Sequence, residues 1–388
     1  MRVVVAMSGG VDSSVAAALL RQAGHEVVGV TMQIWPEGAP ERQARQGGCC
    51  ALGAVSDARA VAELLDIPYY VFTMREEFER HVIARFAAAY AAGRTPNPCV
   101  ACNEHIKFRA LLEKARRLGA EALATGHYAR LGAGPDGQPR LLRAVDRGKD
   151  QSYVLHPLAR ADLGYLRFPV GELPKPEVRR LARSLGLPVA DKPDSQEICF
   201  VGPEGYAAVV AERHPEAARP GPILDVAGRV VGQHRGLAHY TVGQRRGLGL
   251  QGAEARFVLQ LDAARNALVV GGAEDGRAGG CTVPAMNWLV PDPPRAGADL
   301  TVKVRSGPVE HPAVLAAVDP AGLRLRFARP LRAVTPGQGC VLYDGEVVLG
   351  GGEIGAVEPV GGAAEAAGRP GAEGSAEGSA DRFVASPR

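Results

Sequence analysis

The sequence predicts an α/β protein in which an N-terminal doubly wound parallel sheet is followed by a small mixed central domain and a C-terminal antiparallel β-barrel. Short apolar runs alternate with helical segments over the first half of the chain, which is typical of a parallel sheet. Beyond residue 256 the pattern changes to alternating strands, which indicates a second kind of domain. The length of 388 residues also favours more than one hydrophobic core.

The N-terminal domain is defined by its alternation of strands and helices. The apolar runs at 3–6 and 27–32 predict the first two strands, and the Ala/Leu-rich segment 11–23 between them predicts a helix. Further strands are expected at 67–73 and 121–125, and further helices at 57–65, 75–92, 103–118 and 176–186. A Cys-x-x-Cys pair at 99–102 then falls in a loop ahead of a helix. The alternation ends near residue 200, so we place this domain at 1–202.

The remainder of the chain is expected to contain two smaller domains and a tail. A helix is predicted at 204–215 and a Gly/Arg-rich stretch with short strands at 216–250. Alternating strands are predicted at 257–261, 267–271, 300–304, 323–327 and 340–349, the last with Asp344-Gly345 as a hairpin turn. We therefore expect a central domain at 203–272 and a C-terminal β-barrel at 273–356. The Gly/Ala/Ser/Glu-rich stretch 357–388 is expected to be a disordered tail.

Composition limits the possible partners and the location. The net charge is only +3, so a nucleic-acid surface must come from local clusters of basic residues. No apolar run reaches the roughly 18 residues of a membrane span, and the N-terminus lacks the layout of a signal peptide. We expect a cytoplasmic protein without membrane contact, in which the seven cysteines stay reduced. Cys281 and Cys340 are interpreted as buried apolar residues, whereas Cys49 and Cys50 have no evident chemical role.

The stretch AMSGGVDSS at residues 6–14 connects the first strand to the first helix. Its glycines allow a tight turn with inward-facing N–H groups, and the helix N-terminus adds its dipole, so the stretch predicts an anion site. It lacks the Gly-Lys-Ser/Thr ending of a Walker A loop and is not a GxGxxG motif. A plain glycine turn capped by serine is the simpler interpretation. The stretch resembles the PP-loop of the ATP pyrophosphatase superfamily, which implies a Rossmann-like fold and cleavage of ATP to AMP and pyrophosphate.

Further motifs narrow the superfamily to one family. They are NPCVACN (97–103) with IKF (106–108), TGHYAR (125–130), KDQSYVL (149–155), DSQEICFV (194–201), GLAHYTVGQRRGLG (236–249) and PGQGCVLYDGEVVLGGG (336–352). Together with the PP-loop they closely resemble the tRNA-specific 2-thiouridylase family. The resemblance runs from about residue 3 to 355. It implies an enzyme that replaces the C2 oxygen of the wobble uridine (position 34) of certain tRNAs by sulfur.

The resemblance implies a role for individual positions. Cys102 matches the family's nucleophile and Cys199 its persulfide carrier, while Asn97, Pro98 and Cys99 match the wall of the target-base pocket. The ATP-binding positions, with Mg²⁺ accompanying the nucleotide, are Ala6, Met7, Ser8, Gly9, Gly10, Val11, Asp12, Ser13, Met32 and Gly126. The tRNA-contacting positions are His127, Lys149, Asp150, Gln151, Arg305, Ser306 and Gln338. No resident metal is expected.

The implied chemistry requires two cysteines that meet in space. Adenylation turns the C2 oxygen into AMP, a good leaving group, and a persulfide is a good nucleophile for the carbon. Release of its outer sulfur requires a second thiol to attack the inner one, which leaves a disulfide. A cysteine desulfurase or a sulfur-relay protein is implied as the sulfur donor. We also expect the two later domains to grip the anticodon arm, through arginines such as Arg229, Arg235, Arg245 and Arg246.

One position departs from many family members, which carry Asp where this chain has Cys99. Cys99 therefore cannot inherit the acid/base role suggested for that Asp. The presence of cysteine at this position also allows a rival interpretation, in which Cys99, Cys102 and Cys199 bind a [4Fe-4S] cluster in a related tRNA thiolase. A second rival is a non-catalytic, zinc-stabilised RNA-binding protein, but structural zinc needs four close ligands and there is no second Cys-x-x-Cys.

Overall fold

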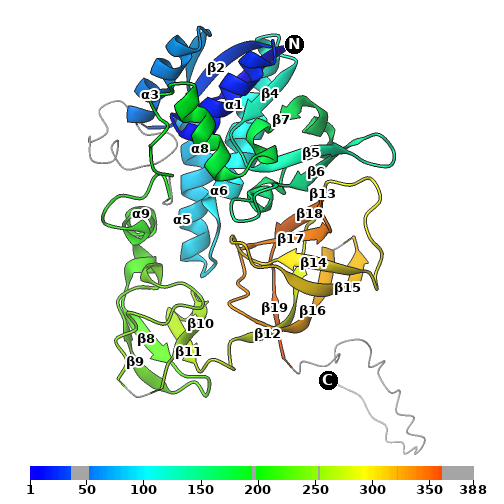
Figure 1. Cartoon of the computed structure of the whole chain (residues 1–388). Coiled ribbons are helices and arrows are strands. Elements are labelled where there is room, and N and C mark those ends of the chain that lie inside the picture. Colours follow the sequence, from blue (N-terminus) through cyan, green and yellow to red (C-terminus); the bar gives the residue numbers. More distant parts are fainter. Residues whose placement is uncertain (36–51, 195–197, 252–253, 321, 361–388) are drawn as a thin grey trace, which may run out of the picture.

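The computed structural model describes residues 1–35, 52–194, 198–251, 254–320 and 322–360 (Figure 1). Cys49, Cys50 and most of the expected tail therefore lie outside the described residues. The chain forms three sheets: a five-stranded parallel sheet near the N-terminus, a four-stranded sheet in the middle, and a large antiparallel sheet that contains the C-terminal strands. Within the described residues, no helix combines the length and the apolar character needed to cross a membrane.

The parallel sheet confirms the predicted α/β fold of the N-terminal part. Its strands are β1 (Arg2–Ala6), β2 (Glu26–Gln33), β3 (Tyr69–Thr73), β4 (Ala122–Thr125) and β7 (Leu166–Arg167), in the order β3-β2-β1-β4-β7. The chain leaves β1 toward β2 on one side and later returns to β4 on the other. This reversal creates a topological switch point at the carboxyl ends of β1 and β4, where ligands bind in open α/β sheets.

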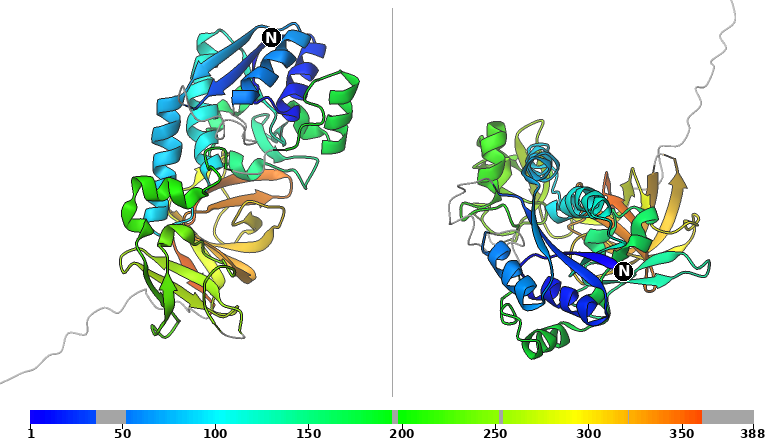
Figure 2. Two further views of the ribbon diagram at one scale, coloured as in Figure 1. Left: turned by 90° about the vertical axis from the view of Figure 1, so that its left-hand side faces the viewer. Right: turned by 90° about the horizontal axis from the view of Figure 1, so that it is seen from above.

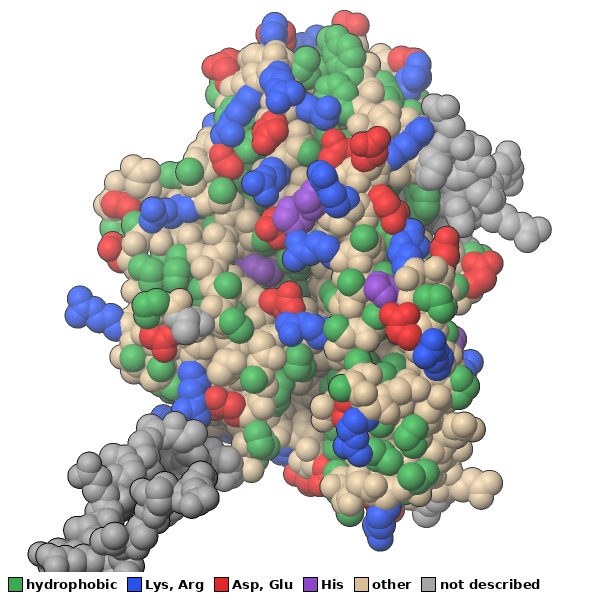
Figure 3. Space-filling model, turned by 180° about the vertical axis from the view of Figure 1, so that it is seen from behind, with side chains coloured by type: hydrophobic (Ala, Val, Ile, Leu, Met, Phe, Trp, Pro, Cys, Tyr) green, Lys and Arg blue, Asp and Glu red, His purple; other side chains and the backbone are tan. Residues whose placement is uncertain are grey.

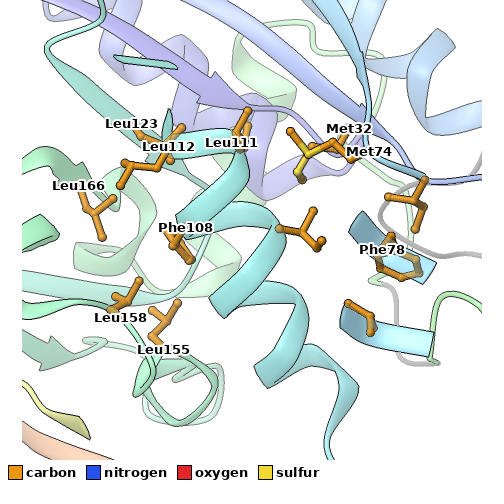
Figure 4. Close-up of a cluster of buried hydrophobic side chains, with 14 of the residues drawn as sticks. Met32, Met74, Phe78, Phe108, Leu111, Leu112, Leu123, Leu155, Leu158 and Leu166 are labelled. Carbon is orange, nitrogen blue, oxygen red and sulfur yellow. The ribbon is translucent and has the colours of Figure 1, made fainter. Parts of the chain in front are cut away.

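Helices cover both faces of this sheet, because successive side chains of a buried strand point to opposite faces. Val3 and Val5 of β1 pack in one cluster with α1 (Val11–Gln22), α3 (Leu52–Leu64) and α8 (Lys175–Ser184). Val4 belongs to the other cluster, under α4 (Arg75–Phe78), η1 (Glu79–Ile83), α5 (Ala84–Ala91), α6 (Pro98–Ala101), η2 (Cys102–Ala110) and α7 (Leu111–Arg117). Figure 4 shows Phe108, Leu111 and Leu112 of this second layer among the buried side chains.

The middle sheet has the order β10-β11-β8-β9, and its strands are β8 (Gly221–Leu224), β9 (Val230–His234), β10 (Phe257–Asp262) and β11 (Ala267–Gly271). It is mixed, because β8 and β11 run parallel whereas the other pairs are antiparallel. Three short helices accompany it: α9 (Tyr206–Arg213), η6 (Pro215–Ala218) and η7 (Leu237–His239). Ile223 and Leu268 lie at the centre of its own small core.

The large antiparallel sheet combines strands from the N-terminal and C-terminal parts of the chain. Its C-terminal strands are β12 (Arg277–Val283), β13 (Asn287–Trp288), β14 (Asp299–Lys303), β15 (His311–Asp319), β16 (Gly322–Arg332), β17 (Gly339–Asp344), β18 (Val347–Glu353) and β19 (Val357–Pro359). The hairpin β5 (Ala129–Ala133) and β6 (Pro139–Arg143) extends it, with Leu142 opposite Val347. The sequence did not predict that an N-terminal hairpin continues the C-terminal sheet. The left view of Figure 2 shows this sheet below the parallel one.

Two predicted boundaries are wrong. The Cys-x-x-Cys pair does not lie in a loop, because the helix begins at Pro98: the Asn97 Oδ1 accepts a hydrogen bond from the Cys99 N–H at 3.0 Å, and proline suits the first helical position. The expected tail does not begin at 357, because Val357–Pro359 form strand β19, which pairs with β12. The remaining described elements are the single turns η3 (Ser152–Leu155), η4 (Arg160–Tyr165) and η5 (Pro169–Glu172).

Candidate active site

A cavity of about 390 Å³ lies at the switch point of the parallel sheet. Its walls come from the turn after β1, the residues after β4, the helix that carries the Cys-x-x-Cys pair, and residues 192–194 and 198–200. It is therefore built from parts of the chain that are far apart in sequence. The molecular surface seen in Figure 3 carries basic and acidic side chains interspersed with one another, in keeping with the net charge of +3.

The conformation of the turn between β1 and α1 is fixed by hydrogen bonds of its own serine side chains. The Ser13 hydroxyl accepts a hydrogen bond from the Ser8 N–H at 3.1 Å and donates to the Gly10 carbonyl at 3.2 Å. The Ser14 hydroxyl also donates to the Gly10 carbonyl, at 2.8 Å. These bonds fix the turn directly ahead of the N-terminus of α1, where backbone N–H groups and the helix dipole favour an anion.

Gly126, directly after β4, closes the other side of the switch point. A Cβ at this position would stand 2.5 Å from the Ser13 backbone nitrogen, a distance that real side chains do not reach. The absence of a side chain therefore lets the β4 end approach the start of α1. Of the predicted ATP-binding residues, only Gly9 is not part of the cavity lining. The residues that do line the cavity are Ala6, Met7, Ser8, Gly10, Val11, Asp12, Ser13, Met32 and Gly126.

Lysines surround the acidic side chains at this end of the cavity. The Lys175 Nζ lies 2.6 Å from Asp12 Oδ1 and 2.9 Å from Asp194 Oδ1. Lys149 contacts Asp194 Oδ2 at 2.8 Å, and Lys192 donates to the Gly9 carbonyl at 2.9 Å. Cations that line a cavity beside an anion-binding turn can neutralise a polyphosphate. Lys175, Lys192 and Asp194 were not predicted as site residues from the sequence, where the two lysines are marked only by a following proline.

The ionisation of this cluster follows from its contacts. Burial alone would raise the pKa of Asp194, but hydrogen bonds from Lys149 and Lys175 lower it to about 2. The carboxylate is therefore charged at neutral pH. Burial raises the pKa of Tyr128, and the charge of Asp12, to which its hydroxyl donates at 2.8 Å, raises it further. Tyr128 thus remains a neutral hydrogen-bond donor that orients Asp12.

Three cysteines line the same cavity. Cys99 and Cys102 lie in the first turns of the helix that begins at Pro98, and Cys199 comes from residues 198–200, which are distant in sequence. The fold therefore brings Cys102 and Cys199, which are far apart in sequence, to one cavity. Pro98 also lines the cavity. Asn97 does not; its side chain is used to cap the helix.

The turn ahead of the cysteine helix is held by both later sheets. Gly93 has φ +74°, and a Cβ there would stand 2.3 Å from the Leu261 carbonyl oxygen of β10. From the other side, the Gln338 Nε2 donates to the Thr95 carbonyl at 2.8 Å, and the Thr95 N–H donates to the Pro336 carbonyl at 3.1 Å. The middle and C-terminal sheets thus fix the approach to Pro98 and Cys99.

The residues expected to contact tRNA fall into three groups. His127, Lys149 and Gln151 line the cavity; the His127 Nδ1 lies 2.7 Å from the Thr125 hydroxyl. Arg305 and Ser306 are exposed in the loop after β14.

The third group, Asp150 and Gln338, is engaged inside the protein. The Asp150 side chain is 1% exposed and pairs with Lys303, so it is not positioned to contact RNA. Gln338 uses its amide to hold Thr95. The expectation of an RNA contact by the Asp150 side chain therefore disagrees with this structure, because burial places its carboxylate against Lys303 instead.

The fold and the cavity define a nucleotide-binding α/β protein with a cysteine-lined site and two appended sheet domains. Three family models match it in order: a tRNA methyl transferase HUP domain at residues 1–203, a tRNA methyl transferase PRC-barrel domain at 208–272, and an aminomethyltransferase beta-barrel domain at 278–354. Because curated tRNA-specific 2-thiouridylases are 49–52% identical to it over 91% of its length, the chain belongs to the tRNA-specific 2-thiouridylase family.

Two curated relatives support this assignment. The chain is 52% identical to a tRNA-specific 2-thiouridylase of Chloroflexus aurantiacus over 352 residues, which cover 91% of this chain and 98% of that protein. It is 49% identical to a tRNA-specific 2-thiouridylase of Symbiobacterium thermophilum over 357 residues, covering 91% and 92%. Among solved structures, a 4-thiouridine synthetase–RNA complex with bound ATP is 17% identical, with a TM-score of 0.32, and covers 53% of this chain and 46% of that chain.

Proposed function

We propose that the protein is a tRNA 2-thiouridylase that adenylates the C2 oxygen of the wobble uridine with ATP and then replaces it by sulfur. The products are 2-thiouridine in tRNA, AMP and pyrophosphate. The observation that carries the proposal is that an anion-binding PP-loop and two cysteines distant in sequence, Cys102 and Cys199, line one cavity. Family membership supports the same reaction.

The PP-loop end of the cavity suits ATP. The N-terminus of α1 and the hydroxyls of Ser8 and Ser13 would hold the phosphates, and Lys149, Lys175 and Lys192 would balance their charge. Asp12 supplies a carboxylate suited to the Mg²⁺ that accompanies ATP, although Lys175 and Tyr128 hold it in the structure described. Attack by the uracil O2 on the α-phosphorus forms the O–P bond, and pyrophosphate leaves.

The cysteine end of the cavity suits the sulfur step. The outer sulfur of a Cys199 persulfide attacks C2, the C2–O bond breaks, and AMP leaves with its electron pair. The Cys102 thiolate then attacks the Cys199 sulfur and breaks the S–S bond to the base, so that the sulfur stays on C2. A Cys102–Cys199 disulfide remains, and an external thiol reductant must reduce it before the next turnover. A cysteine desulfurase or a sulfur-relay protein supplies each new persulfide.

The two later domains would bind the anticodon arm while the wobble base enters the cavity. Turning a base out of its stack costs a few kilocalories per mole, which phosphate contacts elsewhere offset. Arg245, Arg246 and Arg305 are exposed on these domains and are suited to such contacts. We place the enzyme in the cytoplasm, where its cysteines remain reduced between turnovers.

The test is a thiolation assay with unmodified tRNA, ATP, Mg²⁺, a persulfide donor and a thiol reductant. Thiolated tRNA is retarded in a mercury-containing gel, and AMP formation is followed in parallel. Cys102→Ala and Cys199→Ala should each abolish the retarded band. The control is Cys281→Ala, since Cys281 is buried in the C-terminal core and is not among the residues that line the cavity. Full activity of either cavity variant would refute the assigned roles, and an inactive wild-type protein would refute the function.

A further inference from the structure

Asn103, the residue after Cys102, contains a buried acceptor that the rest of the protein does not use. Its side chain lines the cavity, and the residue is 1% exposed. The Nδ2 donates to the Val154 carbonyl at 2.9 Å. Within the described part of the chain, the Oδ1 is buried and has no hydrogen-bond partner. The NH₂ group of the amide is thus hydrogen-bonded, while its oxygen has no partner among the described residues.

The direction of this amide is fixed by chemistry. Only the NH₂ end can face the Val154 carbonyl, since two oxygens would repel each other. The Oδ1 therefore points away from Val154. Buried polar atoms in native proteins are nearly always paired, and leaving one unpaired is costly. An unpaired acceptor beside a substrate cavity is explained if a donor group of the bound substrate forms the missing hydrogen bond with it.

The position of Asn103 favours the target base over the adenine of ATP. The expected adenosine positions, Met32 and Gly126, lie at the strand ends of the parallel sheet. Asn103 instead lies beside Cys102 and bonds to η3, on the side of the cavity that contains the cysteine helix. In uracil, N3 is bonded directly to C2, the carbon at which the sulfur must arrive. A base whose C2 is within reach of the cysteines therefore presents N3 close to them.

We propose that the Asn103 Oδ1 accepts a hydrogen bond from the N3–H of the target uracil and thereby selects uridine over cytidine at the modified position. This inference rests on the proposed function. Cytosine has a lone pair at N3 instead of a hydrogen, so it would bring two acceptors together. Sites built around such a bond discriminate strongly, because the wrong base leaves their buried group unpaired. Asn103 is a positioning residue for the substrate complex, since N3 gives up its proton when O2 is adenylated.

The experiment compares the binding of two tRNAs, identical except for uridine or cytidine at position 34, in the absence of ATP so that no chemistry occurs. Wild-type protein should prefer the uridine tRNA by about 10- to 100-fold. Asn103→Leu, similar in size but without an acceptor, should bring the ratio close to one. Asn103→Asp keeps an acceptor oxygen, and burial favours its protonated form, whose O–H can still donate to Val154, so this variant should retain the preference for uridine.

The outcomes separate recognition from packing. Loss of the preference in Asn103→Leu together with its retention in Asn103→Asp supports the proposal. The proposal is wrong if the wild-type protein shows no preference or if Asn103→Leu leaves the ratio unchanged. It is also wrong if both variants weaken the binding of both tRNAs equally, because Asn103 would then have a packing role only. ATP affinity and thermal stability serve as controls for folding. The wild-type thiolation assay is independent of these ratios, so failure of the proposed function would appear there.

Discussion

Lys303 of β14 and Asp150 of the N-terminal part form an ion pair that is closed off from solvent. The Lys303 Nζ lies 2.9 Å from the Asp150 Oδ2, and the two side chains are 2% and 1% exposed. The other Asp150 oxygen accepts the N–H of Ala144 at 3.0 Å. The neighbours of Asp150 in sequence, Lys149 and Gln151, both line the cavity. The C-terminal sheet thus holds the segment from which two cavity residues project.

Removal of the lysine should destabilise this junction. Lys303→Met leaves the Asp150 carboxylate buried without its counter-ion, which we expect to cost about 3 kcal/mol of unfolding free energy and to lower thiolation through Lys149 and Gln151. The midpoint of thermal unfolding and the kcat/KM for tRNA measure the two effects. The double variant Lys303→Met/Asp150→Asn removes both charges and should recover most of the stability. If Lys303→Met alone unfolds like the wild type, the pair does not hold the junction.

The sequence predicted the parts of this protein that local patterns determine. The strand–turn–helix at residues 3–23 and the later alternating strands follow from apolar periodicity and were found. The helix start at Pro98 was missed although its signals were local: asparagine as cap and proline at the first position.

Features that depend on distant pairing were not predictable in this way. Leu142 and Val347 meet only because a hairpin from the N-terminal part of the chain joins the C-terminal sheet, and no local pattern encodes that register. The contact of Lys175 with both Asp12 and Asp194 arises likewise from three separate segments. The pairing of Cys102 with Cys199 was expected from family resemblance alone, since their separation in sequence carries no geometric information.

Gly126→Ala should weaken nucleotide binding without unfolding the protein. The new methyl group would meet the Ser13 backbone nitrogen at 2.5 Å and push β4 away from the N-terminus of α1, where the phosphates are expected. Overpacking of this kind typically costs about 1–3 kcal/mol, and we expect ATP affinity to fall about tenfold or more. Isothermal titration with ATP measures it. Gly53→Ala in α3 meets no atom within 4 Å and is the matched control. Equal ATP affinity in both variants would contradict the assigned role of Gly126.

The stability of the protein should decrease as the pH falls below about 6.5, because of His156. Burial lowers the pKa of His156 to about 4, and its Nδ1 donates to the Tyr153 carbonyl at 2.8 Å. The folded protein therefore keeps the ring neutral, while the unfolded chain takes up a proton near pH 6.5. Between these values the unfolded state binds more protons, so folding loses up to about 3 kcal/mol by pH 4.

Chemical denaturation at a series of pH values measures this loss. His156→Asn removes the titrating ring and should flatten the dependence between pH 6.5 and 4, whatever its effect on stability at pH 7. A wild-type curve that is already flat across this window would show that His156 is protonated in the folded state as well.

Substitution of Cys99 distinguishes the persulfide reaction from the iron–sulfur alternative. A cluster held by Cys99, Cys102 and Cys199 would lose one of its three thiolate ligands in Cys99→Ser, and with it the activity. In the persulfide reaction Cys99 is part of the cavity wall, so Cys99→Ser should keep most of the thiolation activity. Protein purified without oxygen should also lack the cluster absorbance at about 400 nm. An inactive Cys99→Ser variant together with that absorbance would favour the cluster.

Reversal of the charges on Arg245 and Arg246 should weaken tRNA binding. Both side chains are exposed after the middle domain's η7 helix, whereas the nearby Arg229 is already paired with Asp225. If Arg245 and Arg246 contact phosphates, the variant Arg245→Glu/Arg246→Glu should reduce the slope of log Kd against log salt by about two. Filter binding at several salt concentrations measures both affinity and slope.

The matched control carries the same change in charge at a distant place. Arg21 and Arg117 are exposed near the ends of α1 and α7, at the opposite edge of the parallel sheet from the cavity. Arg21→Glu/Arg117→Glu alters the net charge equally, so any effect of overall charge appears in both double variants. A loss of affinity confined to Arg245→Glu/Arg246→Glu locates the tRNA on the middle domain. Equal losses in the two variants would mean that only long-range attraction is involved, and the middle domain would then not be the surface that grips the anticodon arm.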